Sequence, residues 1–148
     1  MKPTLRPGLT HEFRYLVPDS KTVPHLYPES AQFREMPAVF ATGFMVGLLE
    51  WACIDAIQPH LDPGEQSVGT DVRFSHLAAT PPGLTVTVQV TLEKVEGRRL
   101  TFSLRAHDGV DPISEGTHQR TIIDPVRFMR RVEEKAAFGR GGSAAGGG

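Results

Sequence analysis

The chain has 148 residues, a length that fits one domain with a hydrophobic core of its own. Its 16 basic and 17 acidic side chains nearly cancel, so the composition offers no basic surface for nucleic acid. The first residues, Met1 to Thr4, lack the apolar segment of a signal peptide, and a single cysteine excludes an intrachain disulfide. We therefore expect a cytoplasmic protein that binds neither nucleic acid nor a membrane.

The chain before residue 41 predicts one strand and one loop. Residues 11–17 alternate polar and apolar side chains, which is typical of a strand. Residues 28–37 lie between two prolines and predict a loop, with one helical turn capped by Ser30. Loops that lie against a core helix often serve as lids.

A nearly continuous apolar segment follows, and it predicts a central helix from Thr42 to Gln58 that Pro59 terminates. A helix that is apolar on all sides is a buried helix, and this one is too short to span a bilayer. Its Cys53 has apolar neighbours, which favours an inert core thiol. Its first carboxylate, Glu50, is costly to bury without a partner, and such groups gather at functional sites.

The second half of the chain predicts strands. Alternation of apolar and polar residues indicates strands over residues 67–77, 84–95, 99–107 and 113–123, with a hairpin turn at Asp108-Gly109 and a bulge at Gly116. Asp124 and Pro125 then start a short amphipathic helix that we expect to end at Phe138. Residues 139–148 are rich in glycine and predict a disordered tail, which leaves one domain over residues 1–138.

These elements predict an α+β fold in which an antiparallel sheet wraps one long helix. An antiparallel sheet buries one face, here against the helix. A single sheet of this kind leaves an edge strand unpaired and covers only part of the helix. Pairing of two protomers edge to edge would solve both problems, so we expect a homodimer.

Several segments resemble the bacterial fluoroacetyl-CoA thioesterase family, and the similarity extends without obvious gaps from about residue 8 to about residue 130. The segments that carry it are residues 25–30, 41–53, 79–88, 95–100 and 106–111. This resemblance implies the hotdog fold, a homodimer, and hydrolysis of the thioester of an acyl-CoA. It further implies a short acyl group, with destruction of fluoroacetyl-CoA as a detoxification reaction.

The resemblance also implies a set of site residues. The family's catalytic threonine, glutamate and histidine fall on Thr42, Glu50 and His76, its glycine near the thioester on Gly69, and its arginine on Arg120. An aromatic pair covers the pocket in the family. Phe33 matches its first member, but Met36 stands where the second is phenylalanine, which bears on the preference for fluorinated substrates.

The residue types leave several roles open. Glu50 could form an acyl anhydride, activate water, or pair with an arginine for structure. Thr42 could cap the helix or stand beside backbone N–H groups that stabilise an oxyanion. Eight residues of helix separate Thr42 from Glu50 by ~12 Å, so the two cannot touch if both are helical. Either Thr42 then precedes the helix, or a substrate or water lies between the two side chains.

Other roles are equally undecided. His76 titrates near neutrality and could move a proton, and in the resembling family removal of an α-proton underlies fluorine selectivity. Gly69 could allow close backbone packing or donate its N–H to substrate, and Arg120 could bind a CoA phosphate or pair with an acid. Phe33 and Met36 could gate the pocket or merely cap the core.

The motifs predict no cofactor, because coenzyme A is part of the substrate. The other histidines form no metal-binding spacing, and no glycine-rich phosphate loop is present. Two alternatives to a short-chain thioesterase remain: a hotdog thioesterase or hydratase with a different acyl preference, and a non-catalytic acyl-CoA-binding module. An isolated carboxylate in an apolar helix argues against the binding module.

Overall fold

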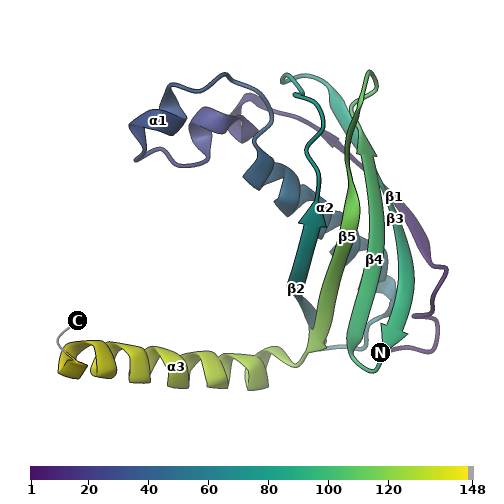
Figure 1. The fold of residues 1–148 in the computed structure, drawn as a ribbon. Coiled ribbons are helices and arrows are strands. Elements are labelled where there is room, and N and C mark those ends of the chain that lie inside the picture. Colours follow the sequence, from purple (N-terminus) through teal and green to yellow (C-terminus); the bar gives the residue numbers. More distant parts are fainter. Residues whose placement is uncertain (147–148) are drawn as a thin grey trace.

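The computed structural model describes residues 1–146, with side chains described to residue 141. An antiparallel sheet curves around one long helix (Figure 1). Its strands are β1 (Thr10–Leu16), β2 (Gln66–Phe74), β3 (Thr85–Glu96), β4 (Arg99–His107) and β5 (Pro112–Ile123), in the order β1-β3-β4-β5-β2. The helices are α1 (Ala31–Arg34), α2 (Thr42–Ile57) and α3 (Pro125–Gly146), with short 3-10 turns at Asp19–Lys21, Val23–His25 and Gln58–His60. The predicted α+β architecture is confirmed.

The helix α2 supplies the centre of the core. Met45, Leu49 and Ile57 are fully buried, and they pack with inward-facing residues of β3 and β4 such as Leu92 and Phe102. The prediction that α2 is buried on all sides is wrong, because Trp51 is 49% exposed. One sheet covers only one side of a helix, and Trp51 instead packs its ring against Phe13 of β1 at 4.7 Å between centroids.

The strand β2 forms one edge of the sheet and pairs with β5 alone. It ends at Phe74, so the strand predicted over residues 67–77 is shorter than expected and His76 lies in the loop that follows. Gly116 of β5 is not a bulge. It pairs with Phe74, and a Cβ atom at Gly116 would lie 1.8 Å from the carbonyl oxygen of Arg73. The bulge lies instead in β2, between Gly69 and Asp71.

The helix α3 extends away from the sheet (Figure 1). It passes Phe138, where we expected it to end, and continues to Gly146, so it includes part of the segment whose composition predicts disorder. Positions 147 and 148 of that predicted tail lie outside the described residues. Val126, Met129 and Val132 are exposed apolar residues on this helix.

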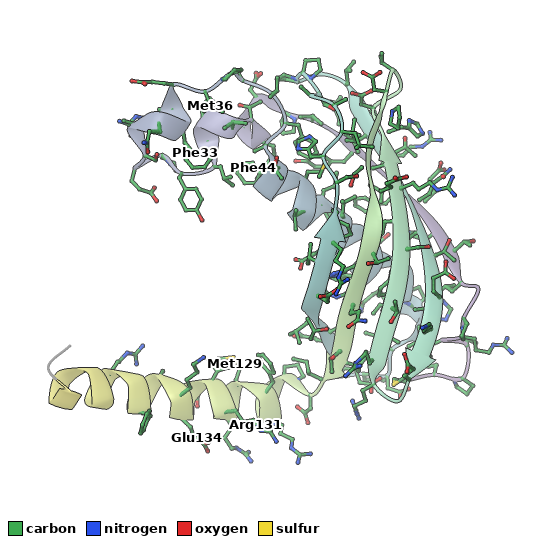
Figure 2. The ribbon with its side chains drawn as sticks, viewed as in Figure 1. Phe33, Met36, Phe44, Met129, Arg131 and Glu134 are labelled. Carbon is green, nitrogen blue, oxygen red and sulfur yellow. The ribbon has the colours of Figure 1, made fainter. Side chains whose placement is uncertain are left out.

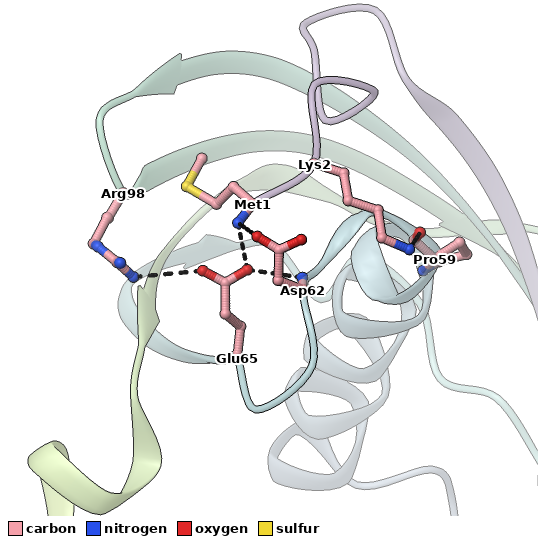
Figure 3. Close-up of polar contacts among 6 residues, drawn as sticks. All are labelled: Met1, Lys2, Pro59, Asp62, Glu65 and Arg98. Carbon is pink, nitrogen blue, oxygen red and sulfur yellow. Dashed lines mark hydrogen bonds and ion pairs between the residues drawn. The ribbon is translucent and has the colours of Figure 1, made fainter.

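An ionic cluster fixes the amino terminus to the turn after α2 (Figure 3). The ammonium group of Met1 donates to Asp62 at 2.7 Å and to Glu65 at 2.5 Å. Arg98, in the turn between β3 and β4, lies 3.7 Å from Glu65. These bonds raise the pKa of the Met1 amine and lower the pKa values of Asp62 and Glu65. The cluster therefore joins three segments at the end of the molecule where α2 ends.

Candidate active site

Thr42 and His76 meet at the amino-terminal end of α2. The Thr42 hydroxyl oxygen lies 2.7 Å from Nδ1 of His76, within hydrogen-bonding distance. Thr42 is the first residue of α2 and Ala41 is its N-cap, so Thr42 does not cap the helix. The first helical hydrogen bond is donated by Met45 to the Ala41 carbonyl, which leaves the N–H groups of the first turn outside the helical ladder beside the Thr42 hydroxyl.

A buried loop holds this pair together. Thr80, fully buried, accepts a hydrogen bond from the backbone N–H of Phe40 through its carbonyl oxygen at 2.8 Å. Its hydroxyl donates to Asp108 at 2.8 Å. Burial by itself would raise the pKa of Asp108, but bonds from the backbone of Asp111 and Val110 and from Thr80 lower it overall. The loop after His76 is thus tied to both the segment before Thr42 and the hairpin between β4 and β5.

His76 is poised as a neutral base. Burial lowers the pKa of His76, and the backbone of Ala78 offsets only part of that effect. Its Nε2 atom is buried and has no hydrogen-bond partner among the described residues. A neutral imidazole paired with a hydroxyl at 2.7 Å is the arrangement of a nucleophile or water-activating group with its base.

Glu50 belongs to a second polar group farther along α2. Its Oε1 atom lies 3.8 Å from Nη1 of Arg120 and 4.0 Å from Nε2 of His118. Its side chain is 36% exposed, so the predicted fully buried acid is wrong. A Cβ atom at Gly69 would lie 2.7 Å from Glu50 Oε1, which favours the interpretation that this glycine permits close packing of the carboxylate.

Arg120 is held tightly beside Glu50. Its Nε donates to the Ser67 hydroxyl at 2.8 Å, its Nη2 to the Ser67 carbonyl at 2.9 Å, and its Nη1 to Nε2 of His118 at 3.1 Å. The guanidinium is buried, and it faces Glu50. Of the two predicted roles for Arg120, the geometry of a single chain favours pairing with an acid.

The three residues predicted to be catalytic therefore form two groups within one chain. Thr42 and Glu50 both lie in α2, eight residues apart, which places them ~12 Å apart along the helix axis. The alternative in which Thr42 precedes the helix is excluded. A substrate, water, or another chain must therefore lie between these groups if they act together.

Phe33 and Met36 lie on the segment that precedes α2, beyond its amino-terminal end (Figure 2). The Ser30 hydroxyl accepts from the Phe33 N–H, so the predicted capped turn is confirmed. The Phe33 ring packs against Tyr27 with centroids 5.4 Å apart, and Met36 is 51% exposed. Leu26 anchors this lid segment, because its side chain occupies the space that a Cβ atom at Gly43 would need, 2.9 Å away.

Sequence reasoning missed His118 and Ser67 as neighbours of the site. The signal for His118 was present, since residues two apart on a strand share a face and Arg120 is on β5. The role of Ser67 depends on the β2–β5 register, which places Ile122 opposite Ser67 and Arg120 opposite Gly69. That register cannot be read from β2 alone.

Other chemistry is limited at this site. Burial raises the pKa of the Cys53 thiol to about 12, which agrees with the predicted inert thiol. Within the described residues, no three His, Cys, Asp or Glu side chains gather closely enough to hold a metal ion. Among the helices that the structure describes, none has the length and apolar character needed to cross a lipid bilayer.

Comparison with known proteins identifies the family. The sequence model of the fluoroacetyl-CoA-specific thioesterases matches residues 21–126. A fluoroacetyl-CoA thioesterase from Streptantibioticus cattleyicolor is 56% identical over 141 residues, which cover 94% of this chain and all of that protein. This chain belongs to the fluoroacetyl-CoA-specific thioesterase family. The predicted family resemblance is confirmed.

Solved structures agree with this membership and confirm the hotdog fold. The fluoroacetyl-CoA thioesterase FlK superposes with a TM-score of 0.86 at 56% identity, over 88% of this chain and 97% of that one. A thioesterase superfamily member from Thermus thermophilus superposes with a TM-score of 0.79 at 29% identity, over 93% and 98% of the two chains. A hot-dog-like protein from Thermanaerovibrio acidaminovorans gives 0.73 at 25% identity, over 90% and 93%.

Proposed function

We propose that this protein hydrolyses the thioester of a short-chain acyl-CoA, with fluoroacetyl-CoA as its main substrate, to the free acid and CoA. The observation that carries this proposal is the Thr42–His76 hydrogen bond at the amino-terminal end of α2 in a member of the thioesterase family. The FlK relative has been crystallised with fluoroacetate and CoA, which supports the same substrate class here.

The chemistry follows from the two polar groups. The thioester carbonyl would lie at the start of α2, where free N–H groups and the positive helix end stabilise the developing oxyanion. Neutral His76 accepts a proton, either from the attacking water or from the acidified α-carbon of a fluoroacetyl group. Glu50 acts as the nucleophile through an acyl anhydride or as the base for water, and both routes balance with water and the thioester alone.

This reaction needs no cofactor, since coenzyme A enters as part of the substrate. We assign Gly69 and Arg120 to the substrate-binding wall around Glu50 because both lie against its carboxylate. Phe33 and Met36 then form the lid over the acyl group. We place the reaction in the cytoplasm and treat it as a detoxification step, and cell fractionation with an antibody against the protein tests the location.

We further propose a homodimer in which two chains share each pocket. Three features support it: the unpaired edge of β2, the exposed apolar residues of α3, and the separation of Thr42 from Glu50 within one chain. In such a dimer, Glu50 of one protomer would serve the Thr42–His76 pair of its partner. Light scattering tests the oligomeric state.

Mixed dimers test whether pockets are shared. Thr42→Ala and Glu50→Gln chains, each inactive alone, are co-expressed with different tags and purified as heterodimers. If each pocket combines Thr42 of one protomer with Glu50 of its partner, one of the two pockets is intact and about half the activity returns. If each pocket uses one chain, both pockets remain damaged and the heterodimer is inactive.

A CoA-release assay tests the reaction. Fluoroacetyl-CoA should be hydrolysed much faster than acetyl-CoA, and Glu50→Gln should abolish turnover. Negligible and equal rates with both substrates would refute the proposal. An intact but hydrated thioester product would indicate the alternative hydratase, and tight binding without turnover would indicate a binding module.

The lid tests acyl selectivity separately. Met36 is flexible where the relatives' pattern has a rigid aromatic ring, so it should admit acyl groups that such a ring excludes. Met36→Phe should therefore lower kcat/KM for propionyl-CoA by more than it lowers kcat/KM for fluoroacetyl-CoA. An unchanged ratio of the two values would remove Met36 from the selectivity gate.

A further inference from the structure

His118 is a buried polar side chain of β5 to which the predicted site gave no role. Its side chain is 0% exposed. Its ring lies between two aromatic rings, with centroids 5.8 Å from Phe74 and 6.4 Å from Phe102. A residue enclosed in this way could simply fill the core, and its polar contacts decide between that role and a functional one.

The contacts of His118 fix its tautomer. Its Nδ1 atom lies 2.7 Å from the carbonyl oxygen of Asp71, which can only accept a hydrogen bond, so Nδ1 carries the proton. Nε2 then presents a lone pair, which accepts from Nη1 of Arg120 at 3.1 Å. Burial, together with the positive charge of Arg120, lowers the pKa of His118 against the opposing effect of Glu50 and Asp71. The neutral ring therefore satisfies both of its partners at once.

The acceptor supplied by His118 acts on the part of Arg120 that faces Glu50. The other two bonds of Arg120, both to Ser67, use Nε and Nη2. Nη1 is bonded to His118 and is also the nitrogen that lies 3.8 Å from the Glu50 carboxylate. Without the Nε2 lone pair, rotation of the guanidinium would no longer be opposed on that side.

We propose that His118 is a positioning residue for thioester hydrolysis: its Nε2 holds Nη1 of Arg120, and Arg120 in turn holds the Glu50 carboxylate. The bulge in β2 between Gly69 and Asp71 belongs to the same arrangement, because the Asp71 carbonyl beside it orients the ring. This inference rests on the proposed role of Glu50 in hydrolysis.

Two substitutions separate the two ring nitrogens. In His118→Asn the amide nitrogen can replace Nδ1 and donate to Asp71, but the side chain ends before Nε2. In His118→Gln the amide oxygen reaches the position of Nε2 and can accept from Arg120, while the donor to Asp71 is lost. We expect His118→Asn to lower kcat by about tenfold or more with KM nearly unchanged, because Glu50 is misplaced. His118→Gln should retain most of the kcat.

Controls distinguish positioning from stability. Ile122→Val removes one methylene from the same face of β5 and should lower the stability of the fold without lowering kcat. In an Arg120→Met background, His118→Asn should cost no further kcat, because its effect passes through Arg120. Circular dichroism and thermal melts confirm that each variant is folded at the assay temperature.

The possible results separate this inference from the proposed function. A wild-type kcat in His118→Asn, or equal losses in the Asn and Gln variants that follow their melting temperatures, would overturn the positioning role. Full turnover in Glu50→Gln would instead overturn the proposed role of Glu50. An inactive Glu50→Gln with a low-kcat His118→Asn and an active His118→Gln supports both.

Discussion

Replacement of Gly69 by alanine provides the sharpest test of how Glu50 is placed. The added Cβ atom would lie 2.7 Å from Glu50 Oε1, whereas ordinary contact begins at 3.4 Å, so the carboxylate must retreat by about 0.7 Å. His118 and Arg120 restrict the alternative directions, at 3.2 Å and 3.4 Å from the same Cβ. Because a displacement of about 1 Å can cost on the order of 100-fold in rate, we expect kcat to fall between about tenfold and 100-fold.

Steady-state CoA release measures this effect for Gly69→Ala. The backbone N–H at position 69 remains, so a loss that appears in kcat identifies the displaced carboxylate and not a lost N–H donor. Gly47→Ala is the matched control: it lies within α2 with nothing within 4 Å of its added Cβ, and it should stabilise the helix by roughly 0.5–1 kcal/mol. A folded Gly69→Ala enzyme with wild-type kcat would refute the argument.

Three further predictions concern other parts of the site. Since burial lowers the pKa of His76, kcat/KM should stay level as pH falls to 6.5 and decline only below it; a midpoint above 6.5 would contradict a neutral His76. Thr80→Val removes the hydroxyl bonded to Asp108 and should cost about 1–3 kcal/mol in urea unfolding at pH 7. Because the pKa of Asp108 is lowered in the fold, this cost should shrink as pH falls through that pKa, below the ordinary 3.8, and a cost that stays constant would exclude the charged bond. Cys53, with its pKa raised to about 12, should resist alkylation at pH 8 until urea unfolds the protein, and rapid labelling of the folded form would show an accessible thiolate.

Local periodicity was sufficient to predict most of the fold. The strands of residues 84–95 and 99–107 agree with β3 and β4 within one residue, because alternation and the turn at Gly97 are local signals. The end of β2 was less accurate, because the chain leaves the sheet at Ser75 through tertiary contacts and not through a turn residue. The exposure of Trp51 was also missed, since an apolar sequence does not reveal how much of a helix one sheet can cover.

The site was predicted less completely than the fold. Thr42, Glu50 and His76 were identified through family resemblance, and the hydrogen bond between Thr42 and His76 supports two of them as a pair. The Glu50 group depends on pairing between β2 and β5, which brings together residues about 50 positions apart along the chain. Sequence alone offers no register for such distant strands, so His118 and Ser67 could not be connected to Arg120.

The separation of the two polar groups is set by the backbone and not by side-chain rotamers. Along α2, the eight residues from Thr42 to Glu50 span ~12 Å. On β5, Ser75 and Leu77 bond the backbone of Glu115 and Ile113, which places His76 beside residue 114, four residues before His118. Four residues of strand span ~13 Å, in agreement with the helix. Because a rigid helix and a paired strand give the same separation, no rotamer change can bring Glu50 to Thr42 in one chain. Direct cooperation between them requires a group that spans this distance, and in a dimer the partner's Glu50 is the candidate that the mixed-chain experiment examines.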